Sequence, residues 1–252
     1  MIGNTFRKLA FAVSFLTIIP VRTGTVTDRV VSGSAAFFPL VGYLIGAVLA
    51  GVCVGMRHIA GEGAAAVVTV AVWLAVTRAL HFDGMTDVFD GFWGGATSED
   101  RLRIMKDSRM GAFGTASGII LIAGKIIFLG QISVENLLPA LLVTPAVARL
   151  TVLFIGVFST RPAGGGLGAI FVKNVRGRAL IAAALLFLVP SYFILNPLYA
   201  VSLVAIGALV SLTLMWLAHR KIGGVNGDVF GATVEITEWM CLLAACVAEQ
   251  WL

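Results

Sequence analysis

Three carboxylates stand close together in a segment that carries no other charge. The stretch from His81 to Gly95 reads HFDGMTDVFDGFWGG and contains Asp83, Asp87 and Asp90. If this segment is helical, spacings of four and three residues place the three side chains on one face, where they repel one another unless a cation lies between them. Carboxylate oxygens are preferred ligands of Mg²⁺ and Mn²⁺. The segment therefore predicts a Mg²⁺ site, with Mn²⁺ as the alternative ion; ordinary turn and capping Asp residues are the other interpretation.

A basic stretch follows and predicts phosphate binding. It reads RLRIMKDSRMGAFG from Arg101, and Arg103, Lys106 and Arg109 are its candidate phosphate-binding residues. A metal that bridges phosphate oxygens, beside cations that neutralise the remaining charge, suits a polyphosphate substrate. Asp107 is a further candidate metal ligand. Alternatively, these cations only fix the membrane orientation, with a local pair between Arg103 and Asp107.

A third polar segment, KIGGVNGD, runs from Lys221 to Asp228. Its glycines either let backbone amides approach an anion closely or form a flexible turn. Asp228 is a candidate metal ligand at the start of the last apolar run. Lys221 and Asn226 are candidate substrate-binding residues.

The composition indicates an integral membrane protein. Of the 252 residues 59% are hydrophobic and 12% charged, against roughly 25% charged residues in soluble domains. The three cysteines lie inside apolar runs and read as buried side chains. Because a bilayer needs about 20 apolar residues per helix, we expect an all-α, polytopic membrane helix bundle, with residues 1–252 forming one domain. The seven expected spans are about 33–56, 63–81, 112–133, 137–158, 178–195, 197–218 and 229–249.

An earlier apolar segment, from Phe6 to Pro20, is short for a span and ends in proline. We interpret it as an interfacial or re-entrant helix. Its basic start also suits a cleaved signal peptide, but no cleavage site of the Ala-x-Ala kind follows.

The basic residues predict the orientation in the membrane. With seven spans and the N-terminus inside, fourteen of the 18 basic residues lie on one side, three lie within spans, and Arg57 alone lies on the other. Cytoplasmic loops are enriched in Lys and Arg. We therefore expect a protein of the cytoplasmic (inner) membrane whose polar loops, about 82–111, 159–177 and 219–228, form a site facing the cytoplasm.

Four charged residues fall within the expected spans: Lys125, Arg149, Glu235 and Glu238. Each costs several kcal/mol in lipid unless it is paired or faces a polar cavity. Mutual pairing is one explanation. The other places Glu235 in the floor of the site, as a substrate-binding residue.

Three ordered motifs now carry a resemblance. They are His81-x-Asp-Gly-x-x-Asp-x-x-Asp-Gly, then Arg103-x-x-Lys-Asp-Ser-Arg-x-Gly-x-x-Gly, then Gly223-Gly-x-x-Gly-Asp-x-x-Gly-Ala-x-x-Glu. With Phe15-Leu-Thr-Ile-Ile-Pro and Phe38-Pro-Leu-Val-Gly, the chain resembles the cobalamin-5′-phosphate synthase family, adenosylcobinamide-GDP ribazoletransferase. The motifs cover nearly the whole chain, whereas residues 134–215 fit by hydrophobic pattern alone.

The resemblance implies a Mg²⁺-dependent late step of vitamin B12 synthesis. α-Ribazole, or its 5′-phosphate, would displace GMP from adenosylcobinamide-GDP and give adenosylcobalamin or its phosphate. On this hypothesis the three Asp of the first motif hold the metal, and Asp90, or as second choice His81, accepts the proton of the attacking hydroxyl. The partners expected are these two substrates and the lipid bilayer, and no nucleic acid. The bulky corrin ring calls for an open cytoplasmic cleft.

Other classes fit less well. A CDP-alcohol phosphotransferase that makes lipids requires Asp-Gly-x-x-Ala-Arg, and here no Ala-Arg pair follows Asp83-Gly84, where Thr86 and Asp87 stand instead. A cation-coupled transporter favours two related halves, and no internal repeat is visible; a structural scaffold needs no carboxylate trio. The small residues at Gly42 and Gly46 could pack helices within one subunit or between the subunits of a homo-oligomer.

Overall fold

The structure, a computed structural model, describes residues 2–159 and 161–251, and this part of the chain is helical without β-strands. Its helices are α1 (Ile2–Leu16), α2 (Asp28–Ser34), the 3-10 turn η1 (Ala35–Phe37), α3 (Phe38–Val76), α4 (Leu80–Gly94), α5 (Ser98–Ile104), α6 (Ala112–Gln131), α7 (Val134–Phe158), α8 (Gly166–Asn174), α9 (Gly177–Ile194), α10 (Pro197–Ile222) and α11 (Gly227–Trp251). Side chains that accept a hydrogen bond from the first turn begin α2, α5, α7 and α10, namely Thr27, Thr97, Ser133 and Asn196.

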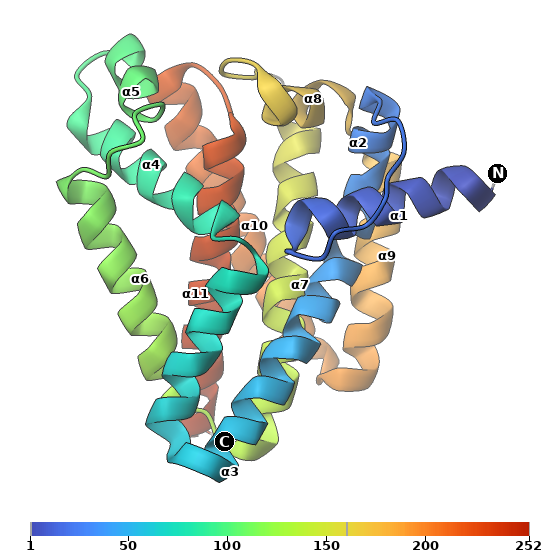
Figure 1. The fold of residues 1–252 in the computed structure, drawn as a ribbon, viewed down its shortest axis with the longest axis vertical. Helices are drawn as coiled ribbons and strands as arrows, with labels where there is room; N and C mark the ends of the chain where they lie inside the picture. Colours follow the sequence, from blue (N-terminus) through green and yellow to red (C-terminus); the bar gives the residue numbers. More distant parts are fainter. Residues whose placement is uncertain (1, 160, 252) are drawn as a thin grey trace.

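The predicted polytopic bundle is confirmed. Within residues 2–159 and 161–251, six helical segments are long and apolar enough to cross a membrane: 28–76, 112–131, 134–158, 177–194, 197–222 and 227–249. The first contains Gly61, whose φ of 80° interrupts α3. In Figure 1, α3 descends, turns and rises again. Its two arms correspond to the first two of the seven predicted spans.

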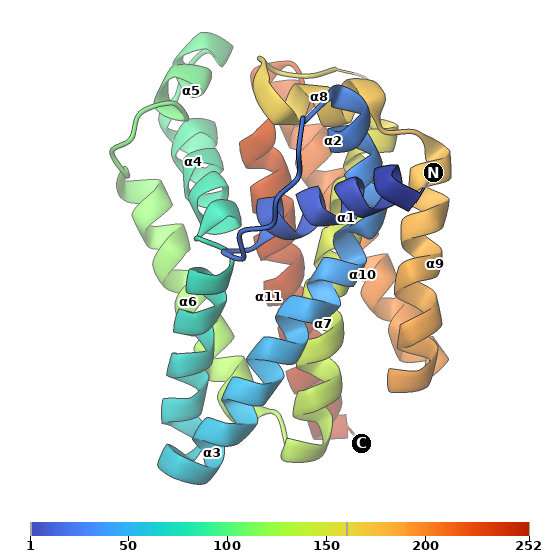
Figure 2. The ribbon, with the colours of Figure 1, turned by 45° about the vertical axis from the view of Figure 1, so that its right-hand side comes forward.

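Helix α1 lies across the long helices rather than along them (Figures 1 and 2). It is absent from the membrane-crossing set, in agreement with the interfacial interpretation. Arg78 donates hydrogen bonds to the carbonyls of Ser14 and Phe15, and the Ile18 amide donates to Val76. The end of α1 is thereby fixed to the connection between α3 and α4.

That connection corrects one predicted boundary. The second span was expected to reach residue 81 with Arg78 inside it, yet α3 ends at Val76. Arg78 and Ala79 have φ values of 55° and 51°, a left-handed conformation that non-glycine residues rarely adopt. The chain turns sharply here and starts α4 in a new direction.

The three predicted polar loops gather at one end of the bundle, where Figure 1 places α5, α8 and the junction of α10 with α11. The first of them is mostly helical, because α4 and α5 fill much of residues 82–111. Sequence reasoning treated this region as a loop on account of its polar residues. Its apolar residues Met85, Val88 and Phe92 lie on one buried face of α4, which explains why a helix forms.

Glycines permit close packing of α3 against α7. A Cβ on Gly42 or Gly46 would overlap the backbone of Ala146 or Leu141. Both glycines therefore pack helices within one chain, which is one of the two roles that the sequence left open.

Candidate active site

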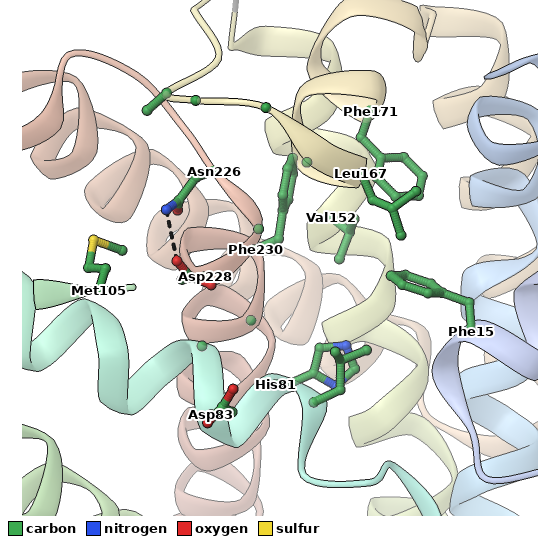
Figure 3. A pocket seen from close by; sticks show the side chains of 18 of the residues that line it. Phe15, His81, Asp83, Met105, Val152, Leu167, Phe171, Asn226, Asp228 and Phe230 are labelled. Carbon is green, nitrogen blue, oxygen red and sulfur yellow. Dashed lines mark hydrogen bonds between the residues drawn. The ribbon is translucent and has the colours of Figure 1, made fainter. Parts of the chain in front are cut away.

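A cavity of about 450 Å³ lies at the polar end of the bundle, between α1, α4, α8 and α11. Its wall has two chemically different parts. Figure 3 shows Asp83 and Asp228 on α4 and α11, with Phe15 and Phe171 on the opposite side. The polar lining residues are His81, Asp83, Lys106, Asn226 and Asp228. The aromatic lining residues are Phe15, Phe38, Phe171 and Phe230.

Two glycines bring α4 and α11 together. A Cβ on Gly84 would lie 2.9 Å from the Cα of Asp228, and one on Gly231 would lie 3.0 Å from the carbonyl oxygen of His81. These distances leave no room for a side chain, so the crossing depends on both glycines. It places Asp228 of the third motif beside Asp83 of the first.

Replacing Gly84 with Ala tests this crossing. The new methyl group must push α11 away from α4, so we expect activity to fall about tenfold and the unfolding free energy to fall by roughly 1–3 kcal/mol. Gly94→Ala on the same helix is the matched control, because its Cβ would meet only Ile104, at 3.7 Å. Turnover and thermal unfolding in detergent measure both effects; equal behaviour of the two variants would contradict the prediction.

The half-buried Asp87 shares a helix face with Asp83. Burial, followed by the neighbouring charges of Asp83, Asp228 and Asp90, raises the pKa of its carboxyl to about 7. The carboxylates thus repel one another, as predicted from their spacing.

The donor chemistry of this cluster fits a hard divalent cation. Asp83, Asp87 and Asp228 offer only oxygen ligands, which Mg²⁺ prefers, and like charges at close quarters are stabilised by a cation. Among residues 2–159 and 161–251, however, no three acidic, His or Cys side chains converge as a metal site. Binding a shared ion therefore requires these side chains to turn toward it.

Asp90, the third member of the trio, is committed to helix capping. Its carboxylate accepts hydrogen bonds from the amides of Gly111 and Gly114, at 2.6 and 2.8 Å. Gly111 is the N-cap of α6 and supplies no side chain of its own, so the carboxylate satisfies free amides at the helix N-terminus. Asp90 of the first motif thus binds the backbone amides of Gly111 and Gly114, the two glycines of the second motif.

The basic residues separate into two groups. Lys106 lines the cavity. Arg103 pairs with Asp100 at 3.1 Å and Arg109 with Asp107 at 2.7 Å, both on the exposed surface. The predicted pair of Arg103 with Asp107 is wrong, because α5 ends at Ile104 and Asp107 lies beyond it.

Asp107 and Lys221 have local partners as well. The Arg109 guanidinium lowers the pKa of Asp107 to about 2. Lys221 donates to the carbonyl of Phe92 at 2.7 Å, near the end of α4, and its own carbonyl accepts from Arg101. Neither Asp107 nor Lys221 lines the cavity.

Gly223 and Gly224 of the third motif lie just before the cavity-lining residues Asn226 and Gly227. Gly223 has a φ of 77° and ends α10 in a left-handed conformation. Gly224 packs against the backbone of Arg161, and Val225 exchanges backbone hydrogen bonds with Arg161 and Ala163. Gly223 thus forms a turn, whereas Gly224 permits close packing of two loops.

Comparison with known proteins decides the family. The model of a family described as cobalamin-5-phosphate synthase matches residues 8–246. The chain belongs to this family. A protein of Desulforamulus reducens named adenosylcobinamide-GDP ribazoletransferase is 34% identical over 97% of this chain and 98% of its own length. Proteins of the same name from Syntrophobacter fumaroxidans and Thermoanaerobacter pseudethanolicus are 36% and 32% identical, covering 93% and 94% of this chain and 96% of each relative. No solved structure matches the chain.

The resemblance read from the three motifs is thus confirmed. As a member of the cobalamin-5-phosphate synthase family, the chain is a transferase of cobalamin biosynthesis. The family match also includes residues 134–215, where the motifs gave no support.

A buried ionic network lies behind the cavity of this family member. Lys125 donates to Glu235 and Glu238, at 2.6 Å each, and Arg149 donates to Glu238. Each of these four side chains is at most 3% exposed. The predicted mutual pairing of these charges is therefore confirmed. The alternative prediction, that Glu235 binds substrate in the floor of the site, is wrong, because Glu235 does not line the cavity.

His81 connects the cavity to this network. Its ring lines the cavity, and Nδ1 lies 3.4 Å from Nη2 of Arg149. Burial, followed by the charges of Arg149 and Lys125, lowers the pKa of His81 well below its usual value. These effects favour the neutral imidazole.

Sequence reasoning missed the aromatic wall of the cavity. Phe38 and Phe171 pack edge to face with centroids 5.5 Å apart, and Phe171 packs in the same way on Phe230 at 6.2 Å. Phe15 lies 6.1 Å from Phe38. Phe15 and Phe38 are the first residues of the two N-terminal motifs that resemble the family. Their place in these motifs was the sequence signal that could have indicated a role at the site.

Proposed function

We propose that this transferase joins α-ribazole, or its 5′-phosphate, to adenosylcobinamide-GDP and releases GMP. A ribazole hydroxyl attacks the phosphorus that carries the cobinamide. A new P–O bond forms, the P–O bond to the bridging oxygen breaks, and the electron pair leaves with GMP. The names of the relatives support these substrates, and the meeting of the three motifs at one cavity is the observation that carries the proposal.

The size and lining of the cavity suit the ribazole and the diphosphate. Ligand pockets commonly measure roughly 300–1,000 Å³, and about 450 Å³ accommodates a riboside with its reacting phosphates but not a corrin macrocycle. The flat apolar base would lie against the phenylalanine wall, and the phosphates beside Asp83, Asp228 and Lys106. The corrin ring would remain outside, toward the cytoplasm.

We assign the metal to Asp83, Asp87 and Asp228. Mg²⁺, with Mn²⁺ as a substitute, would neutralise charge on the diphosphate and orient it for in-line displacement. Asp90 supports this group by fixing α4 to α6 through the two amides that it caps.

Asp83 and Asp228 also line the cavity, so a carboxylate oxygen of either residue that the metal would leave free can accept the hydroxyl proton. Asn226 donates to Oδ2 of Asp228 at 2.8 Å and orients it, as a third group orients a base in many active sites. We prefer these carboxylates to Asp90, whose oxygens already accept amide hydrogen bonds.

Lys106 should matter more than the neighbouring arginines. If its ammonium contacts the diphosphate, Lys106→Ala should lower kcat/KM by roughly 10², the effect of losing a charged contact in the transition state. Arg103→Ala and Arg109→Ala remove exposed surface pairs, and we expect changes below about threefold. Steady-state GMP release measures all three; equal losses would show that the loop acts as a whole.

We also propose that the cavity opens to the cytoplasm, because the basic residues gather at its end of the bundle. A cysteine at Ser98, at the start of α5, should react with impermeant maleimide only from the cytoplasmic side. A cysteine at Glu135, at the start of α7, should react only from the other side. The native cysteines Cys53, Cys241 and Cys246 are buried and give little background. Reversed labelling would invert the proposed orientation.

Purified protein in liposomes provides the test of the activity. With adenosylcobinamide-GDP and α-ribazole, we expect stoichiometric release of GMP and formation of adenosylcobalamin, both abolished by EDTA and restored by Mg²⁺. Parallel reactions contain CDP-diacylglycerol with an alcohol acceptor. Release of CMP without release of GMP would favour the lipid phosphotransferase and overturn the proposal.

A further inference from the structure

The contact between His81 and Arg149 determines which ring nitrogen of His81 carries a proton. Nη2 of Arg149 lies 3.4 Å from Nδ1 of His81. A guanidinium has hydrogen-bond donors and no acceptor. Nδ1 must therefore accept, so it carries no proton. In a neutral imidazole the proton then resides on Nε2.

Arg149 is held in place for this contact. It is fully buried, and its Nη1 donates to Glu238 and to the carbonyl of Pro145. Glu238 is held in turn by Lys125. With Nη1 engaged in this way, Nη2 remains directed at His81.

The other nitrogen of His81 is available to a ligand. In the described part of the chain, Nε2 has no hydrogen-bond partner. It is also not fully enclosed by protein atoms, unlike the buried polar atoms that have no partner. The His81 ring lies on the cavity wall, on the same helix as Asp83 (Figure 3). The cavity is thus the space in which Nε2–H can find an acceptor.

We propose that His81 donates a hydrogen bond from Nε2–H to a phosphate oxygen of the bound substrate, and that Arg149 is a positioning residue that fixes this tautomer. The acceptor class rests on the proposed function, because phosphate oxygens are the acceptors that the reaction brings into the cavity. A donor at this place stabilises charge that develops on the transferring group. A general base would need the opposite arrangement, with a free lone pair toward the hydroxyl. The proton therefore goes to a cavity carboxylate.

Two replacements of His81 separate donor from base. The amide of Gln places its NH₂ near the position of Nε2 and can donate, but it cannot accept a proton as a base. The amide of Asn is one methylene shorter and can accept from Arg149 without reaching the cavity. We expect His81→Gln to retain at least about a tenth of kcat, and His81→Asn to lose roughly 10². His58→Asn, on the first arm of α3, is the control for loss of a histidine far from the cavity. Equal losses in His81→Gln and His81→Asn would overturn the donor role.

The tautomer can be read without activity. In ¹⁵N-histidine-labelled protein in nanodiscs, the His81 signals, assigned by their absence from His81→Asn, should show a protonated Nε2 and an unprotonated Nδ1. Arg149→Met should release this preference, and loss of the fold in that variant would leave the wild-type spectrum as the decisive measurement. A protonated Nδ1 in the wild type would overturn the inference even in an active enzyme. A protonated Nε2 in a protein that releases no GMP would instead refute the proposed function and leave the tautomer assignment standing.

Discussion

Asp83→Asn and Asp87→Asn should each abolish measurable transfer, with kcat reduced by at least about 10² to 10³. Asn keeps the shape of the side chain and removes the charge that would bind Mg²⁺. Neither substitution should destabilise the fold, because the carboxylates repel one another in the metal-free protein: burial, followed by the charges of Asp83 and Asp228, raises the pKa of Asp87 to about 7. A small gain in thermal stability without metal is the expected accompanying result.

Metal binding and catalysis should fail together in these variants. Mn²⁺ titration followed by electron paramagnetic resonance measures metal binding, and GMP release measures catalysis. Asp100→Asn is the matched control, since Asp100 is a surface residue paired with Arg103. Normal Mn²⁺ affinity in Asp87→Asn would remove that residue from the metal site. Normal turnover in both variants would refute the carboxylate cluster as the active site.

Glu238→Gln should cause the largest loss of stability. Glu238 accepts from Lys125 and Arg149, and all three side chains are buried. Removing one partner of a buried ion pair leaves an uncompensated charge and costs about 3–5 kcal/mol. Glu62→Gln, which breaks a pair at 3.5 Å whose Glu is 65% exposed, should cost less than about 1 kcal/mol. Unfolding in mixed detergent micelles, followed by circular dichroism, compares the two.

A double replacement tests whether charge balance causes the loss. Lys125→Met alone leaves Glu235 and Glu238 facing one cation, Arg149. Adding Glu235→Gln restores neutrality around the remaining pair of Glu238 and Arg149. The double variant should therefore be more stable than Lys125→Met, a non-additive effect expected of residues in contact. A double variant less stable than both single variants would show that packing and hydrogen bonding, rather than charge balance, dominate.

The apolar segments could be predicted from sequence because the lipid phase allows few solutions for a chain of this composition. The three motifs likewise predicted the cavity, because Asp83, Lys106 and Asp228, one from each motif, line it. Mutual pairing of the four charges within the spans was one of the two interpretations that the cost of isolated charge in lipid suggested. These inferences depend on composition and spacing alone.

What the sequence did not indicate depends on contacts between distant segments. Asp90 caps α6 through the amide of Gly111, which lies 21 positions further along the chain, whereas its spacing from Asp83 and Asp87 had suggested a metal ligand or a base. Lys221 and Lys106 were both candidate phosphate-binding residues. Only Lys221 donates a hydrogen bond to the carbonyl of Phe92. The turn at Arg78 and Ala79 requires left-handed φ values that neither residue favours, so local propensity predicted a continuous helix there.

The position of α1 has a consequence for biosynthesis in the cell. The cavity takes Phe15 from the first helix and Asp228 from the last. During translation the N-terminal helix emerges long before α11, and the crossing of α4 with α11 can form only after both have been synthesised. A ribosome that stalls, or a protease that cuts, before α11 leaves a product with several inserted helices and no assembled cavity. Partial chains of this transferase should therefore lack even residual activity, and co-expression of complementary fragments offers the only way for them to regain it.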